Sequence, residues 1–356
     1  MKEKLEVGIL GATGMVGAEY VRMLADHPWF KVKYVVGKKS AGKKFKEAKA
    51  GEWVTSYEPP KEIAEMMVQE ADPEHQSADM FFSCLPTDAA RELEPLYAKY
   101  FPTYSDASAY RMEPDVPLLI PEINPEQWVL IKEQGKRGWK GFLTTGPNCT
   151  SIGLNLTLKP LHEDFKIKKI VVSTMQAVSG AGFPGVASMS ILDNVIPYIK
   201  DEEEKVFIET NKILGKVVEN RVEFANIDVA AMCHRVPTID GHMESVYIET
   251  EKKITPEDAA DSLKKFRGLP QELKLPTAPD QPIIVREEPD RPQTRLDRYA
   301  GSVPGMSVVV GRIRKGLDDH SIRYTLLSHN TVRGAAGNTI LTAEMFHKEG
   351  WMYEYR

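Results

Sequence analysis

Short apolar runs alternate with amphipathic stretches through the first 150 residues of the chain. The runs have the length of buried β-strands, and they cover residues 5–10, 31–36, 78–84, 102–105 and 139–143. A helix is expected to continue after residue 17 through residues 20–24 and to end near residues 26–28, and residues 88–100 predict another helix with apolar side chains on one face. Alternation of this kind is typical of a parallel, doubly wound sheet. The pattern therefore predicts a Rossmann-like α/β domain.

The pattern changes after residue 149, where alternating and branched apolar residues become common. The strands expected there are residues 168–177, 229–234, 245–250, 283–286, 306–312 and 322–327. The helices expected there are residues 186–199, 203–214 and 256–266, with a last helix from residue 330. We therefore expect a second α+β domain with a mixed or antiparallel sheet over residues 149–329. Residues 1–148 form the dinucleotide-binding domain, completed by a C-terminal helix within residues 330–356.

A glycine turn joins the first expected strand to the first expected helix. It reads Gly11-Ala12-Thr13-Gly14-Met15-Val16-Gly17, a G-x-x-G-x-x-G spacing in place of the usual G-x-G-x-x-G. Amides at such a turn and at the helix N-terminus can bind a pyrophosphate, and glycines let the backbone approach it closely. A plain tight turn is the alternative, but the flanking strand and helix favour dinucleotide binding.

The loop after the second strand bears on the choice between NAD and NADP. An NAD enzyme commonly has a carboxylate there to accept the ribose 2′-hydroxyl. Residues 37–46 contain no carboxylate and read Gly-Lys-Lys-Ser-Ala-Gly-Lys-Lys-Phe-Lys. Cations and the Ser40 hydroxyl suit a 2′-phosphate, so we expect NADP. A solvated lysine-rich loop would explain most of these lysines equally well.

Cys149 follows a strand and a Gly146-Pro147 break, and it would lie in the first turn of a helix that Asn148 or Thr150 caps. Unpaired amides and the helix dipole at that position favour the thiolate, which is the reactive form of cysteine. Pro160 is expected to end or bend this helix. A small buried core cysteine is the alternative interpretation.

Composition restricts the functional classes. The chain has 356 residues, 42% of them hydrophobic and 27% charged, with a net charge of −5. These values suit two globular domains and give no reason to expect nucleic acid as a partner. No apolar run has the length of a membrane span, and the N-terminus lacks the pattern of a signal peptide. Three scattered cysteines (Cys84, Cys149, Cys233) indicate a reducing, cytoplasmic setting, and we expect no metal site.

Further polar residues stand at ends of expected elements. Arg111 follows one strand and is a candidate anion ligand, with a surface ion pair as the alternative. Gln176 ends another strand, before a glycine loop at Gly180. Either His242 or His234 can serve as a general base near neutral pH, and the sequence does not decide between them.

Several motifs in order resemble aspartate-semialdehyde dehydrogenases of the archaeal and fungal type over nearly the whole chain. The motifs are residues 11–17, Gly146-Pro147-Asn148-Cys149-Thr150, Met175-Gln176-Ala177-Val178-Ser179-Gly180, Glu209-Thr210-Asn211-Lys212, Arg235 through His242, and Arg333-Gly334-Ala335-Ala336. The resemblance implies NADPH-dependent conversion of aspartyl-4-phosphate to aspartate-4-semialdehyde, in lysine, threonine and methionine biosynthesis. It also implies a homodimer or homotetramer, with the second sheet as interface.

The resemblance implies a role for each matching residue. Cys149 would be the nucleophile, His242 the acid/base and Gln176 the group that orients the acyl intermediate. Arg235 would bind the substrate α-carboxylate and Glu209 its ammonium group. The substrate site would be completed by Lys212 and Arg111, which hold phosphate, and by Asn148. The residues that would bind NADP are Gly11, Thr13, Gly14, Met15, Val16, Ser40, Ser83, Gly180 and Asn330. Relatives often have an Arg-Ser pair where this chain has Lys39-Ser40.

Four other functions compete with this one. A malonyl-CoA reductase on the same scaffold would use the same thioester chemistry, but it needs no partner for a substrate ammonium group. An N-acetylglutamyl-phosphate reductase acts on a substrate whose amine is acylated, so it likewise needs no partner for an ammonium group. A Cys-His hydrolase would not explain the glycine turn. A non-catalytic nucleotide sensor would not explain Cys149, Gln176 and His242 together.

Overall fold

The first domain is built on a five-stranded parallel sheet. The structure is a computed structural model that describes residues 4–49 and 57–354. Its first sheet has the order β2-β1-β3-β4-β5, in which every neighbouring pair is parallel. The strands are β1 (Leu5–Leu10), β2 (Phe30–Val36), β3 (Met80–Ser83), β4 (Pro102–Ser105) and β5 (Phe142–Thr145). The strand order reverses between β1 and β3, where doubly wound sheets bind their ligands.

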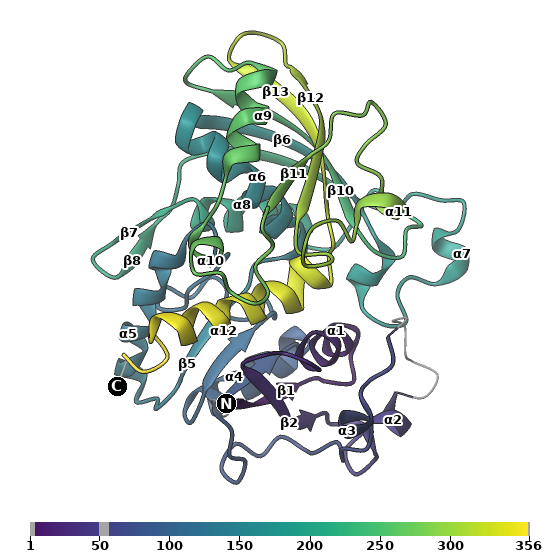
Figure 1. The fold of residues 1–356 in the computed structure, drawn as a ribbon, viewed down its shortest axis with the longest axis vertical. Coiled ribbons are helices and arrows are strands. Elements are labelled where there is room, and N and C mark those ends of the chain that lie inside the picture. The colour runs from purple at the N-terminus through teal and green to yellow at the C-terminus, as the bar shows by residue number, and fades with distance from the viewer. Residues whose placement is uncertain (1–3, 50–56, 355–356) are drawn as a thin grey trace.

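Helices flank this sheet, and the last helix of the chain returns to it (Figure 1). The helices α1 (Met15–Leu24), α4 (Thr87–Ala98) and α12 (Gly337–Glu349) are accompanied by the short α2 (Phe45–Ala48), α3 (Lys61–Ala64) and α5 (Ile131–Gln134). Short 3₁₀ turns are Pro125–Leu130 and Gly135–Arg137. The α12 residues Ile340, Leu341 and Phe346 are buried in the same core as the β1 residues Val7 and Ile9. Apolar burial therefore fixes the C-terminal helix to the first domain.

The second domain contains a six-stranded mixed sheet of order β11-β12-β13-β10-β6-β9. Its strands are β6 (Ile167–Gln176), β9 (Asp228–Arg235), β10 (His242–Thr250), β11 (Ile283–Val285), β12 (Val308–Lys315) and β13 (Ser321–Ser328). The pairs β6/β9 and β11/β12 are parallel, and the other neighbours are antiparallel. A separate two-stranded hairpin consists of β7 (Lys216–Val218) and β8 (Arg221–Glu223).

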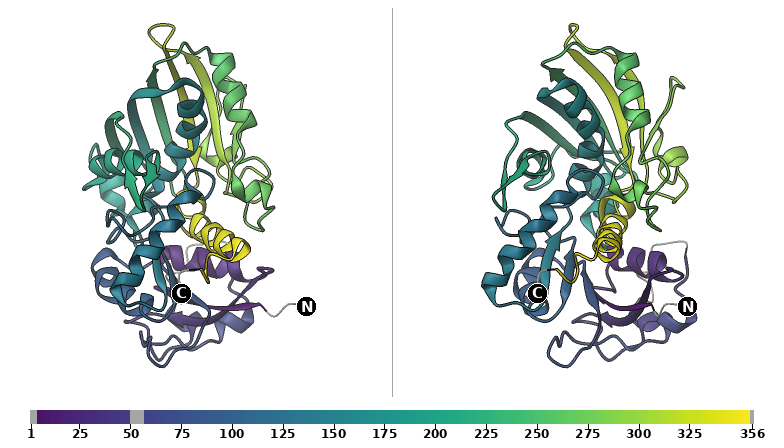
Figure 2. Two further views of the ribbon diagram at one scale, coloured as in Figure 1. Left: turned by 90° about the vertical axis from the view of Figure 1, so that its left-hand side faces the viewer. Right: turned by 60° about the vertical axis from the view of Figure 1, so that its left-hand side comes forward.

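One face of the second sheet is covered by helices, and Figure 2 shows them on the same side. These helices are α6 (Cys149–Phe165), α8 (Glu202–Ile213) and α9 (Pro256–Lys265). Along β10 the side chains alternate, so His242, Glu244 and Val246 are buried on this inner face. The shorter helical segments of this half are Val178–Ala181, α7 (Ser188–Ile191), α10 (Leu269–Glu272), α11 (Thr294–Asp297) and the π-helical turn Val332–Ala336.

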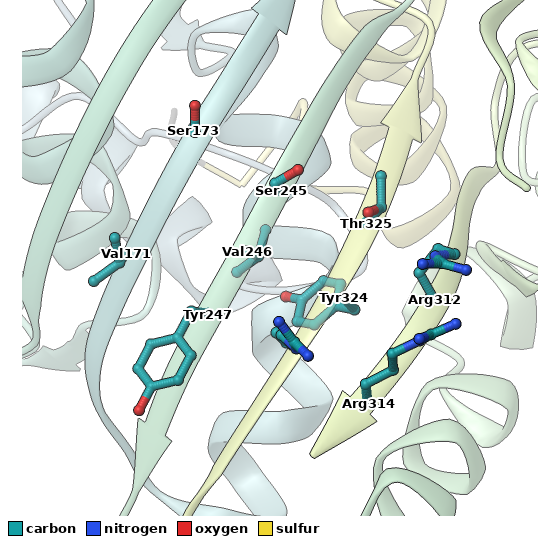
Figure 3. Close-up of a pocket in the computed structure, with 10 residues that line it drawn as sticks. Val171, Ser173, Ser245, Val246, Tyr247, Arg312, Arg314, Tyr324 and Thr325 are labelled. Carbon is teal, nitrogen blue, oxygen red and sulfur yellow. The ribbon is translucent and has the colours of Figure 1, made fainter. Parts of the chain in front are cut away.

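The opposite face of the second sheet carries a shallow pocket with a volume of about 400 Å³. Figure 3 shows its lining side chains on neighbouring strands. Tyr247 and Ser245 of β10 line it together with Arg323 of β13 and with Arg312 and Arg314 of β12. This pocket lies across the sheet from Cys149, because Ser245, Tyr247 and Arg323 alternate along their strands with Val246 and Tyr324, which pack in the core on the α6 side.

The predicted fold class is confirmed, and two expected helices are wrong in extent. The helix that begins at Cys149 does not end at Pro160 but runs to Phe165. Leu158 and Leu161 on either side of the proline are fully buried, and their burial outweighs the hydrogen bond that the proline removes. The helix expected at 186–199 shrinks to α7, because Asp193 just beyond it takes a left-handed φ of 57°.

None of the helices in the described part of the chain combines the length and the apolar character needed to cross a bilayer.

Candidate active site

Cys149 is the first residue of α6, and Asn148 caps that helix. The Asn148 side-chain oxygen accepts from the amides of Thr150 at 2.8 Å and Ser151 at 3.4 Å. The backbone amide of Asn148 donates to the Glu209 carboxylate at 2.7 Å. Gly334 packs so closely that a Cβ there would lie 2.8 Å from the Cys149 Cβ. The nucleophile candidate is therefore fixed by the helix cap on one side and by the π-helical turn on the other.

The helix start lowers the pKa of the Cys149 thiol through the Thr150 amide, as expected, but burial of the sulfur acts against it. Burial raises the pKa of the Cys149 thiol to about 12, and the Glu202 carboxylate acts in the same direction. The guanidinium groups of Arg111 and Arg235 lower this pKa, but they do not offset the burial. Loss of water around the sulfur is thus the largest influence on its pKa.

His242 faces Cys149 from the start of β10. Its Nε2 lies 3.2 Å from the Cys149 Sγ, and its side chain is fully buried. The backbone amide of Ala177 donates to Nδ1 at 3.1 Å, so Nδ1 carries a lone pair and the neutral ring has its proton on Nε2. Burial lowers the pKa of His242 to about 3, which keeps the ring neutral. The other candidate, His234, instead contacts the Thr174 carbonyl at 3.1 Å.

Gln176 is the last residue of β6, and its side chain contacts the first turn of α6. Its amide nitrogen donates to the Thr150 hydroxyl and to a Glu202 oxygen, both at 2.7 Å. Its amide oxygen accepts from the Thr174 hydroxyl at 3.1 Å. Both protons of the Gln176 amide are therefore engaged within the protein.

Charged groups of both signs surround the nucleophile. Arg111 donates to Glu209 at 2.9 Å and to the Asp106 carbonyl at 2.7 Å. Arg235 donates to the Ala177 carbonyl at 2.7 Å, and its burial lowers its pKa. These side chains are at most 7% exposed, so their charges act in a poorly hydrated pocket. The site can therefore hold a small molecule that carries both a cation and anions.

Lys212 is placed differently from the expectation of direct phosphate contact. Its ammonium group donates to the carbonyls of Arg111 at 2.6 Å, Glu113 at 3.0 Å and Val116 at 3.0 Å. An ammonium group has three protons, and all three are used by this loop. Burial lowers the pKa of Lys212 to about 8. In this geometry Lys212 holds the loop that carries Arg111.

Gly180 and Asn330 border the pocket next to His242. A Cβ at Gly180 would lie 2.8 Å from an Arg235 guanidinium nitrogen and 3.2 Å from the His242 Nε2. Asn330 donates to the Ser179 hydroxyl at 2.8 Å and accepts from the Gly241 amide at 2.8 Å. Asn330 thus ties together the two loops that approach the pocket.

The glycine turn after β1 has the geometry of a phosphate cradle. Gly11 has a φ of +83°, and a Cβ at Gly17 would lie 2.4 Å from the Ala12 carbonyl oxygen. The amides of Met15 and Val16 in the first turn of α1 have no acceptor within the helix. Thr13 lies in the same turn, and its hydroxyl accepts from Ser40 at 3.3 Å. The residues present therefore fit a dinucleotide pyrophosphate.

The lysine-rich loop contains only some cations that can reach a ligand. Lys44 and Lys46 form ion pairs with Glu65, at 2.7 Å in the case of Lys44. Lys38 and Lys39 are exposed beside Ser40. The Glu-, Pro- and Gln-rich sequence of residues 55–78 predicts a surface connection with a short helix. Residues 55 and 56 lie outside the described residues, and the rest includes the short α3.

Ser83 ends β3 near the cradle, but its side chain points into the domain. It is fully buried, and its hydroxyl donates to Glu94 at 2.7 Å. A cofactor contact from Ser83 would therefore have to come from its backbone.

Sequence reasoning missed two groups of this site. Glu202 bonds to Asn148, Thr150 and Gln176. The Ala177 amide sets the tautomer of His242. Neither residue type stands out in sequence, although the acidic start of the helix at residue 202 is visible as a favourable helix N-terminus.

Fold and site together define a class of protein, namely two-domain dehydrogenases in which a Rossmann domain adjoins a domain that presents a cysteine and a histidine. Residues 6–131 match the family described as semialdehyde dehydrogenase, NAD binding domain. Residues 158–333 match the family described as semialdehyde dehydrogenase, dimerisation domain. An aspartate-semialdehyde dehydrogenase of Archaeoglobus fulgidus is 51% identical over 97% of this chain and 99% of its own length. The chain belongs to the aspartate-semialdehyde dehydrogenase family.

Two further comparisons concern the cofactor and the alternative reaction. The crystal structure of the Candida albicans aspartate-semialdehyde dehydrogenase with NADP has a TM-score of 0.88 and 37% identity, covering 98% of this chain and all of that chain. A malonyl-CoA reductase (NADP) of Metallosphaera sedula is 44% identical, covering 99% of each chain.

Proposed function

We propose that this protein reduces L-aspartyl-4-phosphate to L-aspartate-4-semialdehyde with NADPH. The observation that carries the proposal is the set of buried charges around Cys149, in which Arg111, Arg235 and Glu209 offer partners to two anionic groups and one ammonium group. The names of the relatives and the NADP in the Candida albicans structure support the same reaction and cofactor.

The sulfur of Cys149 attacks the acyl-phosphate carbon, the carbon–oxygen bond to phosphate breaks and a thioester forms, while the thiol proton passes to the substrate phosphate group. NADPH, when bound, supplies the hydride that reduces this thioester. The hemithioacetal formed on Cys149 then collapses to the aldehyde and returns the thiolate. Because the His242 Nε2 carries the proton, we propose that this group donates to the sulfur and stabilises the thiolate before attack and after collapse.

Substrate binding requires exchange of one ion pair. In the ligand-free site Glu209 is paired with Arg111 at 2.9 Å. A substrate ammonium group can replace the guanidinium at Glu209, which leaves Arg111 to bind the phosphate while Arg235 binds the α-carboxylate. We propose that Lys212 supports the phosphate by holding the Arg111 loop. Asn148 presents the first-turn amides that can stabilise the developing oxyanion.

NADP would lie along the C-terminal edge of the first sheet. The amides and side chains that would hold the pyrophosphate are those of Gly11, Thr13, Gly14, Met15 and Val16. The 2′-phosphate would contact Ser40 with Lys38 or Lys39, because Lys44 and Lys46 are paired with Glu65. Gly180 and Asn330 would border the nicotinamide, and Ser83 would contribute through its backbone. The proposed domains are residues 1–148 with 330–356, and residues 149–329.

We also propose that two copies associate through the open face of the second sheet. The match to a dimerisation domain supports association, and Ser245 and Arg323 are exposed on this face. Tetramer formation from two such dimers is the larger alternative. Three free cysteines support a cytoplasmic location. Sedimentation of wild type and of a Tyr247→Asp variant tests the interface, since a charge there should shift the protein to monomers.

The reaction is tested with aspartate-4-semialdehyde, phosphate and NADP, by following NADPH formation. We expect phosphate-dependent activity in the wild type, none in Cys149→Ala, and the same NADPH affinity in both proteins. Malonyl-CoA with NADPH is the comparison, because the malonyl-CoA reductase relative is 44% identical. Activity with malonyl-CoA alone would replace the proposed function by the alternative. The buried Glu209 favours the amino-acid substrate, because malonyl-CoA has no ammonium group to pair with it.

A further inference from the structure

The Glu202 carboxylate accepts hydrogen bonds from three side chains near Cys149, those of Asn148, Thr150 and Gln176. Glu202 lies in the first turn of α8 and is 6% exposed. Its carboxylate accepts from the Asn148 amide at 3.0 and 3.1 Å, from the Thr150 hydroxyl at 3.3 Å and from the Gln176 amide at 2.7 Å. Asn148 and Thr150 are the two chain neighbours of Cys149. One carboxylate therefore joins α8, the start of α6 and the end of β6.

These contacts decide which way the two amides point. With its nitrogen bonded to Glu202, Asn148 must turn its oxygen to the amides of α6. Gln176 has both amide protons engaged, one by Glu202 and one by Thr150. Without the carboxylate, Asn148 would be held only by the amides of α6 and Gln176 only by the hydroxyls of Thr150 and Thr174, so both amides would be less firmly fixed.

Glu202 also places a negative charge near the sulfur. The groups that face it are Cys149 on α6, Arg235 and Cys233 on β9, and Glu244 on β10. The two oxygens of Glu244 are buried and have no partner, and burial raises the pKa of Glu244 far above its usual value. Burial thus disfavours the charged form of Glu244, and the carboxylate of Glu202 acts against formation of the Cys149 thiolate.

We propose that Glu202 is a positioning residue that orients Asn148 and Gln176 around Cys149 and keeps the free thiol protonated until substrate binds. The effect on turnover rests on the proposed function, whereas the effect on the thiol does not. A protonated thiol resists alkylation and oxidation, so the same residue protects the nucleophile and aligns its neighbours.

Two substitutions separate the effect of the Glu202 charge from the effect of its side-chain length. Glu202→Gln keeps the length and removes the charge. Glu202→Asp keeps the charge, but its shorter side chain cannot reach both amides. Glu204→Gln is the matched control, because Glu204 lies in the same helical turn and is exposed.

The first measurement is the rate at which iodoacetamide modifies Cys149 as a function of pH, followed by mass spectrometry of the peptide that contains it. For Glu202→Gln we expect a rate at pH 7 that is about tenfold higher than wild type, which corresponds to a fall of about one unit in the thiol pKa. Glu202→Asp and Glu204→Gln should follow the wild-type profile. A Glu202→Gln profile that superimposes on wild type would overturn the electrostatic part, whichever substrate the enzyme uses.

The second measurement is kcat for the substrate that the wild type turns over. We expect kcat to fall about tenfold in Glu202→Gln and further in Glu202→Asp, with unchanged NADPH affinity and with Glu204→Gln at the wild-type value. Wild-type kcat in both Glu202 variants would overturn the positioning role.

If Glu202→Asp does not fold, the double variant Glu202→Gln/Gln176→Leu replaces it. A positioning role makes the two substitutions non-additive, so the loss in the double variant should be smaller than the sum of the losses in Glu202→Gln and Gln176→Leu. Additive losses would contradict the proposal.

Discussion

The buried ion pair between Arg333 and Glu122 offers a direct test of how the C-terminal segment is held. Both side chains are fully buried, and two parallel hydrogen bonds of 2.8 and 2.6 Å join them. Arg333 lies in the π-helical turn next to Gly334, which packs on Cys149. Replacing Arg333 by Met removes the charge and keeps much of the side-chain volume, but it leaves the Glu122 carboxylate buried and unpaired.

The unpaired, buried carboxylate of Glu122 determines how far Arg333→Met lowers the free energy of unfolding. Breaking a buried ion pair by removing one partner costs about 3–5 kcal/mol, most of it from the charge that remains. With an m-value of about 3 kcal/mol per M of urea, the unfolding midpoint of Arg333→Met should fall by about 1–2 M. The double variant Arg333→Met/Glu122→Leu removes both charges and should regain most of that loss.

Tryptophan fluorescence during urea unfolding measures these midpoints. Arg221→Met is the matched control, because Arg221 pairs with Glu219 on the surface at 3.4 Å. Loss of this exposed pair should change the free energy of unfolding by less than about 1 kcal/mol. A double variant no more stable than Arg333→Met would refute the reasoning, since the loss would then come from packing and not from the stranded carboxylate.

Three further predictions concern the active site. Gly180→Ala should lower kcat/KM by at least about tenfold, because its methyl group would lie 2.8 Å from the Arg235 guanidinium and 3.2 Å from the His242 Nε2. Steady-state kinetics measure this loss, and a wild-type kcat/KM would show that the Gly180 loop moves to accommodate the methyl group. The logarithm of the Cys149 alkylation rate should rise with pH, without a plateau between pH 6 and 9, because the pKa of the thiol is raised to about 12 and that of His242 is lowered to about 3. A plateau near neutrality would instead indicate a preformed thiolate–imidazolium pair. Lys212→Met should raise the KM for phosphate about tenfold with little change in NADPH affinity, because the loop that carries Arg111 loses three hydrogen bonds; a loss of cofactor binding alone would contradict this role.

Local periodicity was sufficient to predict the class of fold, because buried strands and amphipathic helices repeat with different periods. It failed where tertiary packing opposes a local signal, as at Pro160, which lies inside a helix held by buried leucines. The end of α7 depends on a left-handed residue, Asp193, whose conformation the sequence does not specify.

The residues of the candidate site likewise fall into those whose placement the sequence predicts and those whose placement it does not. The Cys149 helix start and the glycine turn depend on neighbours in the chain, so the sequence predicted their placement. The choice between His242 and His234 depends on which face of its strand each side chain occupies. Alternation along a strand shows that successive side chains face opposite sides, but not which of them face the site. The contacts of Lys212 and of Glu202 join residues that lie 26 to 101 positions apart. Such contacts exist only after the two sheets are assembled.

The return of α12 to the first domain has a consequence for synthesis on the ribosome. Phe346 packs against Tyr104 of β4 and Phe142 of β5 in the first sheet. The nascent nucleotide-binding half therefore emerges more than 180 residues before its final core side chains are made. It must remain incomplete, with apolar surface exposed, until translation ends, so a premature stop shortly before α12 should damage the beginning of the protein as much as its end.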